Sequence, residues 1–432
     1  MSPDPHQHDG LPDASGDAGK DAFGELLGDC VHCGFCLPTC PTYVLWGEEM
    51  DSPRGRIHLM QQHHDGAPLT PEMTGHFDAC LGCLACVTSC PSGVRYDKLI
   101  EHTREEVEQA RPPQDRALRE AIFAVFPYPR RLRALRGPLR AYQKSGLSRI
   151  AGPALERLHP VLAAMERLAP PLGRAYRLPA KISARGERRA TVGMLTGCVQ
   201  REFFPQVNSA TARVLAMEGC DVIVPKGQGC CGALSLHSGR GDEARAFAKK
   251  TIIAFESVDV IVVNSAGCGS AMKEYAALFA DDPAWAGRAE ALTAKTRDFT
   301  EYLVELGPRA ERHPLDVTVA YHDACHLGHA QGIRAQPREL LRGIPGLELK
   351  EIADPDVCCG SAGTYNLLQP EAANELGDLK AANVQKTGAR WLVAANPGCT
   401  LQIATALRRK GEEISVAHPA QILDASLRGL PL

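Results

Sequence analysis

The chain has 432 residues, with 48 Lys and Arg residues against 51 Asp and Glu residues and a formal net charge of -3. This length exceeds what one hydrophobic core usually supports, so we expect two or three domains. The near-balanced charge gives no basis for nucleic-acid binding. No apolar stretch of the sequence is long enough to span a bilayer.

The amino-terminal segment and the cysteine content indicate the compartment. Residues 1–20 are polar and lack the apolar core of a secretory signal, so we expect a disordered tail. The chain contains 17 cysteines. Without an export signal these are better explained as thiolate ligands in a reducing cytoplasm than as disulfides. We therefore expect a cytoplasmic protein that meets a membrane only at its surface or through a partner.

Two copies of one cysteine motif dominate residues 21–111. Each reads C-x2-C-x2-C-x3-C-P, the run that binds [4Fe–4S] cubes in bacterial ferredoxins. Three closely spaced thiolates can surround one cube, whereas the fourth, redirected by the proline, reaches the other cube. Structural zinc is the alternative. We expect one cluster on Cys30, Cys33, Cys36 and Cys90 and a second on Cys40, Cys80, Cys83 and Cys86.

The residues between and after the two motifs predict helices. Ser52 is a candidate N-cap followed by Pro53 at the first helical position, and Pro71 begins a second helix that leads to the second motif. Apolar residues recur at helical spacing from Tyr96 to Glu108. We therefore expect a helical two-cluster domain, and not the small βαβ-like ferredoxin.

Residues 112–190 form a basic connector that many prolines divide into short helices. Five arginines meet few acids here, which suggests either a docking face for a partner subunit or anionic lipid, or connecting helices with solvated side chains. These arginines are Arg130, Arg131, Arg133, Arg136 and Arg140.

The remainder of the chain contains an internal duplication. Residues 191–314 and residues 315–432 each read strand-Cys, helix, strand-Cys-Cys-Gly, helix, strand-Cys, and we call them the first and second CCG halves. Apolar strands that alternate with helices predict a parallel sheet covered on both faces. The cysteines then lie at the carboxyl ends of strands, where open α/β sheets place their sites. The fold class is thus multidomain α+β and α/β, a helical ferredoxin domain followed by two duplicated α/β halves.

Each CCG half offers four thiols as candidate redox or ligand groups. Buried cysteines that act only as small hydrophobes do not account for eight at matching positions. An iron–sulfur centre, a structural zinc ion and a reactive dithiol all remain open. His322, His326 and His329, close to one of these cysteines, could be ligands or proton donors. The eight residues are Cys198, Cys230, Cys231, Cys268, Cys325, Cys358, Cys359 and Cys399.

Several stretches together resemble the iron–sulfur subunit of bacterial glycolate oxidase (glycolate dehydrogenase) over nearly the whole chain from about Asp21. Besides the first ferredoxin motif, they are Tyr321-His322-Asp323-Ala324-Cys325-His326-Leu327, Cys358-Cys359-Gly360-Ser361-Ala362-Gly363-Thr364-Tyr365-Asn366 and Asn396-Pro397-Gly398-Cys399-Thr400-Leu401-Gln402. Heterodisulfide reductase subunits share the CCG pair, but their fullest pattern ends each half in C-x2-C. Here Ala271 and Gln402 occupy those last cysteine positions.

The resemblance implies an oxidoreductase complex in which this chain is one subunit. A separate FAD-containing dehydrogenase subunit would oxidise glycolate to glyoxylate and hold the substrate site. This chain would relay the electrons through its two [4Fe–4S] clusters to an acceptor such as quinone, on the cytoplasmic face of the inner membrane. The alternative for the complex is a related lactate, glycerol-3-phosphate or heterodisulfide oxidoreductase. Two other classes of function for this chain stay open: a thiol/disulfide reductase and a zinc-stabilised assembly protein.

Overall fold

The computed structural model describes residues 17–147, 155, 157, 160–173 and 176–432. Residues 1–16 of the tail expected at residues 1–20 therefore lie outside the described residues. Helix α1 (Asp17–Gly28) begins within the last part of that expected tail, which is accordingly helical.

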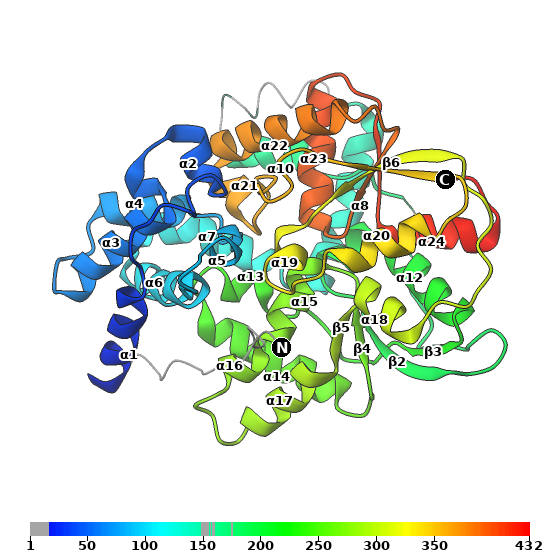
Figure 1. Cartoon of the computed structure of the whole chain (residues 1–432), viewed down its shortest axis with the longest axis horizontal. Coiled ribbons are helices and arrows are strands. Elements are labelled where there is room, and N and C mark those ends of the chain that lie inside the picture. Colours follow the sequence, from blue (N-terminus) through cyan, green and yellow to red (C-terminus); the bar gives the residue numbers. More distant parts are fainter. Residues whose placement is uncertain (1–16, 148–154, 156, 158–159, 174–175) are drawn as a thin grey trace.

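The amino-terminal domain is built from helices packed around the two cysteine motifs (Figure 1). The N-cap predicted at Ser52 is confirmed, because its Oγ accepts a hydrogen bond of 3.0 Å from the Gly55 amide. Phe77 and Leu99 are fully buried in the core of this domain. After α1, the elements are α2 (Pro41–Trp46), η1 (Glu49–Asp51), α3 (Pro53–His64), α4 (Pro71–Ala79), α5 (Ala85–Thr88) and α6 (Tyr96–Ala110).

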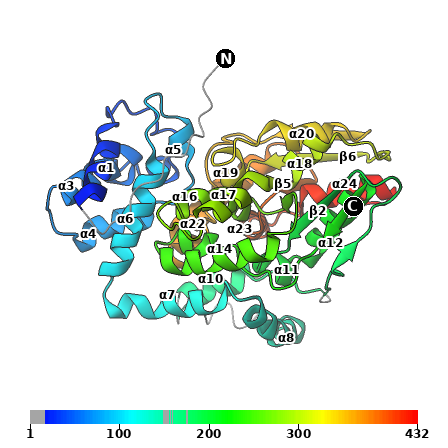
Figure 2. The same cartoon turned by 90° about the horizontal axis from the view of Figure 1, so that it is seen from below.

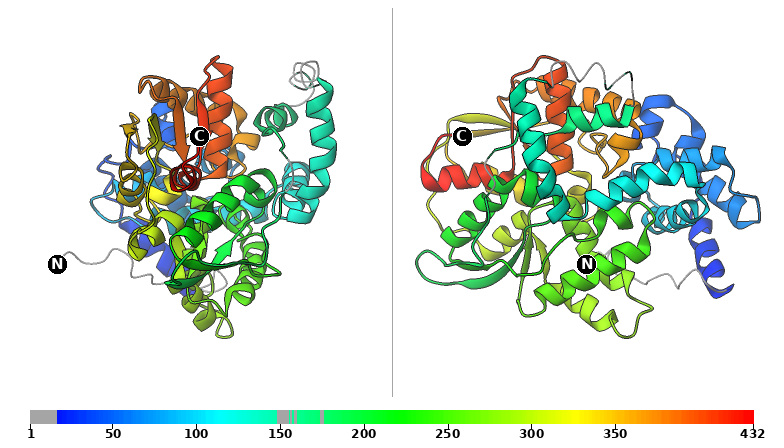
Figure 3. Two further views of the ribbon diagram at one scale, coloured as in Figure 1. Left: turned by 90° about the vertical axis from the view of Figure 1, so that its right-hand side faces the viewer. Right: turned by 180° about the vertical axis from the view of Figure 1, so that it is seen from behind.

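The connector consists of α7 (Pro113–Val125), α8 (Pro129–Ser145) and α10 (Pro160–Leu168), which lie across the back of the molecule (Figure 3, right). Helix α8 projects farthest from the rest of the molecule, at the bottom of Figure 2. Several of its arginines make internal contacts. The Arg133 Nη2 atom lies 2.6 Å from the buried carboxylate of Glu202, and Arg136 donates to the Gly173 carbonyl at 3.0 Å. The basic run is therefore partly structural. Strand β1 (Lys181–Ile182), inside the expected connector, pairs antiparallel with β3 and joins the first sheet.

Each CCG half has its own sheet, in the order β1-β3-β2-β4-β5 for the first and β7-β6-β8-β9 for the second. Apart from β1 the pairings are parallel, as predicted. The first half contains β2 (Ala190–Leu195), α11 (Val199–Phe203), α12 (Pro205–Met217), β3 (Cys220–Ile223), α13 (Ala233–Leu236), α14 (Gly241–Phe255), β4 (Ile261–Val263), α15 (Ala266–Lys273), α16 (Tyr275–Leu278), α17 (Ala286–Lys295), β5 (Thr296–Asp298) and α18 (Phe299–Leu306). The second contains β6 (Val317–His322), α19 (Cys325–Gly328), α20 (Ala335–Arg342), β7 (Leu347–Glu351), α21 (Tyr365–Leu368), α22 (Pro370–Gln385), β8 (Trp391–Ala394), α23 (Pro397–Arg409), β9 (Ser415–Ala417) and α24 (Pro419–Arg428).

The two halves share one hydrophobic core and exchange helices in a pseudo-symmetric way. Helix α12 of the first half packs on α24, the last helix of the second, and α20 of the second half packs on α18, the last helix of the first. Val192 of β2 and Tyr321 of β6 belong to the same buried cluster. The carboxyl ends of the two sheets also meet, since the Ala266 amide donates to the Ala395 carbonyl at 3.1 Å. The interface thus brings the two cysteine sets to one region.

Candidate metal centres

The loops of the two ferredoxin motifs share an unusual backbone conformation at equivalent positions. The residues before and after the second cysteine of each motif have positive φ angles. These are His32 (52°) and Gly34 (85°) in the first motif, and Gly82 (60°) and Leu84 (63°) in the second. Because residues other than glycine rarely adopt this region, the two loops are held in a specific curled path. Such a path turns closely spaced cysteines toward one point, which fits an iron–sulfur cube.

The four cysteines expected to bind the second cluster lie in a common buried region. Cys40, Cys80, Cys83 and Cys86 are each less than a tenth exposed. The sulfur of Cys80 accepts hydrogen bonds from the Gly82 amide at 3.3 Å and from the Tyr96 hydroxyl at 3.6 Å. Such hydrogen bonds to ligand sulfur, together with burial, are the means by which proteins set cluster potentials.

A buried arginine supplies positive charge beside this set. The Arg56 side chain is 1% exposed and contacts the Asp51 carboxylate at 3.1 Å and Thr42 Oγ1 at 3.2 Å. Burial opposes ionisation of Cys80, but Arg56 and Arg104 outweigh it and hold the pKa of Cys80 below its ordinary value. Burial raises the pKa of Cys83 and Cys86 instead. The sequence analysis did not identify Arg56. The one pattern that could have indicated it is a charged residue on the apolar face of the helix Pro53–His64.

The cysteines expected to bind the first cluster are more exposed. Cys33 is exposed, whereas Cys30, Cys36 and Cys90 are half-buried. Burial raises the pKa of Cys36 to about 11. The two motifs contact each other beside their fourth cysteines, where the Ser89 hydroxyl donates a hydrogen bond of 3.2 Å to Thr39 Oγ1. Which cysteine binds which cluster remains a prediction.

The four thiols of the first CCG half form a chain of contacts. The Sγ atoms of Cys198 and Cys230 lie 3.7 Å apart. Hydrogen bonds from the thiols of Cys230 and Cys268 lower the pKa of Cys231 well below its ordinary value. Contacts with Cys198 and Cys231 raise the pKa of Cys230, and the contact with Cys231 raises that of Cys268, so Cys231 ionises more readily than either of these two.

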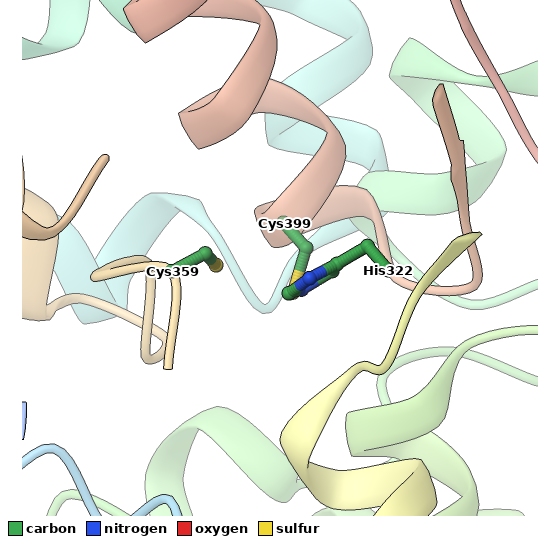
Figure 4. Close-up of side chains that lie close together, drawn as sticks. All are labelled: His322, Cys359 and Cys399. Carbon is green, nitrogen blue, oxygen red and sulfur yellow. The ribbon is translucent and has the colours of Figure 1, made fainter. Parts of the chain in front are cut away.

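In the second CCG half, a histidine joins the thiols. Donor atoms of His322, Cys359 and Cys399 all lie within 4.8 Å of one another, and the three side chains are buried (Figure 4). His322 comes from the end of β6, Cys359 from the loop after β7 and Cys399 from the first turn of α23. Burial, helped by the nearby Lys380 ammonium, lowers the pKa of His322 to about 3. The imidazole is therefore neutral, the form in which histidine binds metals.

The other two histidines named from the sequence have different surroundings. His326 Nδ1 lies 3.6 Å from the sulfur of its neighbour Cys325, and its ring stacks against His237 of the first half at 4.8 Å between centroids. His329 Nδ1 lies 2.7 Å from the Thr88 hydroxyl, and so connects the second ferredoxin motif to the second half. Neither is part of the three-donor group around His322.

The second ferredoxin motif packs directly on the second CCG half. Cys83 belongs to the same buried cluster as Cys358, and Tyr365 of α21 lies in that cluster too. Arg104 of α6 connects the second ferredoxin motif to the first CCG half. It donates to the Cys80 carbonyl and, at 2.8 Å, to the His237 carbonyl. No sequence pattern predicts this packing, because the contacting residues are far apart in the chain. The buried cysteine set therefore reaches the CCG thiols through Cys83.

Comparison with known families agrees with this arrangement. The family described as a 4Fe-4S dicluster domain matches residues 26–94, and the cysteine-rich domain matches residues 192–273 and 319–404. The linker region of the glycolate oxidase iron-sulfur subunit matches residues 114–169. The fold and the cysteine sets thus define an iron–sulfur protein in which a dicluster domain precedes two cysteine-rich α/β domains.

Individual relatives narrow this class. The chain is 38% identical to the probable glycolate oxidase iron-sulfur subunit of Bacillus subtilis, over 93% of this chain and 94% of that protein. It is 36% identical to the glycolate oxidase iron-sulfur subunit of Escherichia coli, over the same shares. The chain belongs to the family of glycolate oxidase iron–sulfur subunits. The relatives are subunits of an oxidoreductase complex.

Two further comparisons are more limited. Lactate utilization protein A of Shouchella clausii is 34% identical, over 54% of this chain and 98% of that protein. A crystal structure of a hypothetical protein from Helicobacter pylori superposes with a TM-score of 0.52 at 8% identity, over 94% of this chain and 76% of that one, and shows a shared fold alone. Among the described helices, none has the length and apolar character needed to cross a membrane.

Proposed function

We propose that this chain relays electrons inside a glycolate-oxidising complex. A partner subunit that contains FAD would oxidise glycolate to glyoxylate, and two [4Fe–4S] clusters on this chain would carry the electrons to an acceptor such as quinone. The complex would lie on the cytoplasmic face of the inner membrane and contact it peripherally. The chemistry of transfer belongs to the clusters, whereas the chain fixes their positions and tunes their potentials.

One observation above all supports this proposal: the two cysteine sets differ in exposure. Cys33 is exposed, and the apolar side chains of Val31 and Phe35 beside it are 68% and 66% exposed. Exposed apolar groups of this kind mark contact surfaces for other proteins. The other set is buried against the second CCG half. We infer that electrons pass between this chain and its redox partner at Cys33, and continue inward to the buried cluster.

The test is to replace Cys33 by alanine in the full complex, purified without oxygen. Cys33→Ala should abolish the EPR signal of one reduced cluster, preserve the other and stop glycolate-dependent dye reduction. Cys220→Ala is the matched control, because Cys220 is a buried cysteine outside both motifs and both CCG sets, in contact with the Tyr302 hydroxyl at 4.0 Å. Full turnover of the Cys33 variant, or iron-free wild-type protein that is fully active, would refute the relay.

Thiol/disulfide chemistry in the first CCG half is a second candidate function. The 3.7 Å contact between Cys198 and Cys230, beside the readily ionised Cys231, favours it. Joining Cys198 and Cys230 in a disulfide would pass two electrons to the quinone-class acceptor of the complex and release two protons. Cys198→Ala with unchanged turnover in the complex would exclude this role.

A panel of glycolate, lactate and glycerol 3-phosphate, tested on the co-purified complex, decides the substrate.

A further inference from the structure

The two CCG halves differ at the place where the second half has its histidine. In the second sheet His322 pairs with Ala394, and in the first sheet Leu195 pairs with Val263. Cys399 follows Ala394 at the same spacing as Cys268 follows Val263. His322 and Leu195 therefore occupy equivalent positions, and the buried imidazole of one half replaces a buried apolar side chain of the other.

A second difference lies in the helix that covers the Cys-Cys-Gly turn. The turn glycines Gly232 and Gly360 approach the carbonyls of Ala244 in α14 and Ala373 in α22, which makes these two alanines equivalent. At the same spacing after them stand Thr251 in the first half and Lys380 in the second.

These two residues have different partners. Thr251 is fully hydrogen-bonded to carbonyls, including that of Cys230 at 3.4 Å. Lys380 is 1% exposed and donates to the Asp354 carbonyl at 2.6 Å, with Cys358 and Cys359 in electrostatic reach. A buried ammonium offsets the negative charge of nearby thiolates. The second half therefore has a counter-charge at a position where the first half has a neutral hydroxyl.

The His322 ring itself is incompletely satisfied. It is 2% exposed, and its Nε2 atom has no hydrogen-bond partner in the part of the chain that the structure describes. A buried polar atom without a partner is costly, so a native structure that keeps one needs an explanation. Cys359 and Cys399 lie beside the ring, and Asn396 Nδ2 contacts the Cys399 sulfur at 3.7 Å, the kind of outer contact that orients a ligand. Metal binding would satisfy the imidazole.

The spacing of the donors decides between a single ion and a cube. With zinc–sulfur bonds of about 2.3 Å, two ligands of a tetrahedral ion lie about 3.8 Å apart. In a [4Fe–4S] cube each cysteine binds a different iron atom, so the ligand sulfurs lie farther apart. The three donors here fall within 4.8 Å of one another, close to the tetrahedral edge. Among the described residues, no group of three such donors forms around the thiols of the first half.

We propose that the second CCG half, and not the first, holds a single zinc-class ion bound by His322, Cys359 and Cys399. The neighbouring Cys358 thiol, which interacts with the thiols of Cys325 and Cys359, would supply the fourth ligand. Such a closed site of nitrogen and sulfur ligands is structural. It rests on donors separate from the ferredoxin cysteines, so its fate is independent of the relay proposed above.

The experiment counts metals in the full-length chain after purification without oxygen and removal of loosely bound ions with EDTA. Wild-type protein should contain about one zinc per chain in addition to its iron, as expected for a closed site. His322→Leu, which installs the residue of the first half, should lose at least nine-tenths of the zinc and none of the iron. Cys268→Ala in the first half is the matched control and should retain the zinc.

A second variant separates loss of the ion from loss of the fold. His322→Cys should keep the zinc, and the zinc X-ray absorption spectrum should change from mixed nitrogen and sulfur ligands to sulfur alone. Wild-type protein that is zinc-free would overturn the proposal. So would His322→Leu protein that keeps its zinc or loses iron instead, Cys268→Ala protein that loses zinc equally, or a His322→Cys spectrum without the change.

Discussion

Replacing Arg56 should lower the reduction potential of the buried cluster and leave the exposed cluster almost unchanged. Arg56 Nη2 lies 3.2 Å from Thr42 Oγ1, which lies 3.3 Å from Cys40 Sγ, so nitrogen and sulfur are at most about 6.5 Å apart. At an effective dielectric constant of about 20, unit charges at that separation interact by about 2.5 kcal/mol. For a one-electron couple this corresponds to about 110 mV.

The sign follows from charge. A reduced cluster is one unit more negative than an oxidised one, so the Arg56 cation favours the reduced form. The added electron spreads over the whole cube, which weakens the interaction. We therefore expect Arg56→Met to lower the potential by roughly 50–100 mV. Removing the cation also takes one partner from the buried Asp51 carboxylate and leaves it with His76 Nδ1 at 3.0 Å, so the free energy of unfolding should fall by up to about 3 kcal/mol.

The assay is an anaerobic redox titration followed by EPR, with variants that separate charge from folding. Arg56→Met combined with Asp51→Asn also removes the carboxylate charge, which by itself disfavours reduction, so its potential should lie between those of the wild-type and Arg56→Met proteins. Arg56→Lys keeps the charge and should restore most of the potential. Arg54→Met is the control, because Arg54 contacts the first motif through the His32 carbonyl at 2.9 Å. Intact clusters with unchanged or raised potentials in the Arg56→Met protein would refute the electrostatic reasoning.

Two other predictions concern the junction between the ferredoxin domain and the first CCG half. Gly239→Ala would place a methyl group 2.1 Å from the Arg104 carbonyl oxygen at a φ of +74°, so its midpoint of thermal unfolding should fall by several degrees. Gly227→Ala, with a φ of +87° and, apart from its chain neighbours, no atom of the described residues within 4 Å of the new methyl group, should cost only about 1 kcal/mol. An equal loss in both would contradict the packing argument. Burial and the neighbouring Glu101 carboxylate raise the pKa of Glu274 to about 7, from 4.5. The folded chain therefore binds the extra proton and loses stability as the pH rises from about 4.5 to about 7. Glu274→Gln should thus stabilise the chain at pH 8, by up to about 3 kcal/mol, and have little effect at pH 5. Equal effects at both pH values in thermal unfolding would show that the carboxyl group does not titrate in this way.

Much of the fold followed from local sequence signals. The repeated strand-Cys pattern predicted two parallel sheets, because apolar runs with helices between them have few other solutions. Ser52 and Pro53 predicted the start of α3, because capping depends on neighbouring residues. The antiparallel edge strand β1 was not predicted, since Lys181–Ile182 has no strand pattern of its own and is ordered by its pairing with β3.

The candidate site was predictable in its thiols but not in its charges. The cysteine spacing predicted all the thiols of the candidate site. His322 was among the three histidines that the sequence indicated as possible ligands or proton donors. The burial of Lys380 and Arg56 was not visible, because an isolated cation in a helix usually points to solvent. Nor did spacing place Cys83 beside Cys358, a contact that depends on how whole domains pack.

The exchange of terminal helices between the CCG halves has a consequence for the whole relay. Each half supplies the last helix that covers its neighbour, α24 over α12 and α18 over α20. Neither half can be removed without baring an apolar surface on the one that remains. Truncated chains would therefore aggregate before they could report on a single half. Point substitutions in the intact subunit are therefore the appropriate tool, because they keep both terminal helices in place.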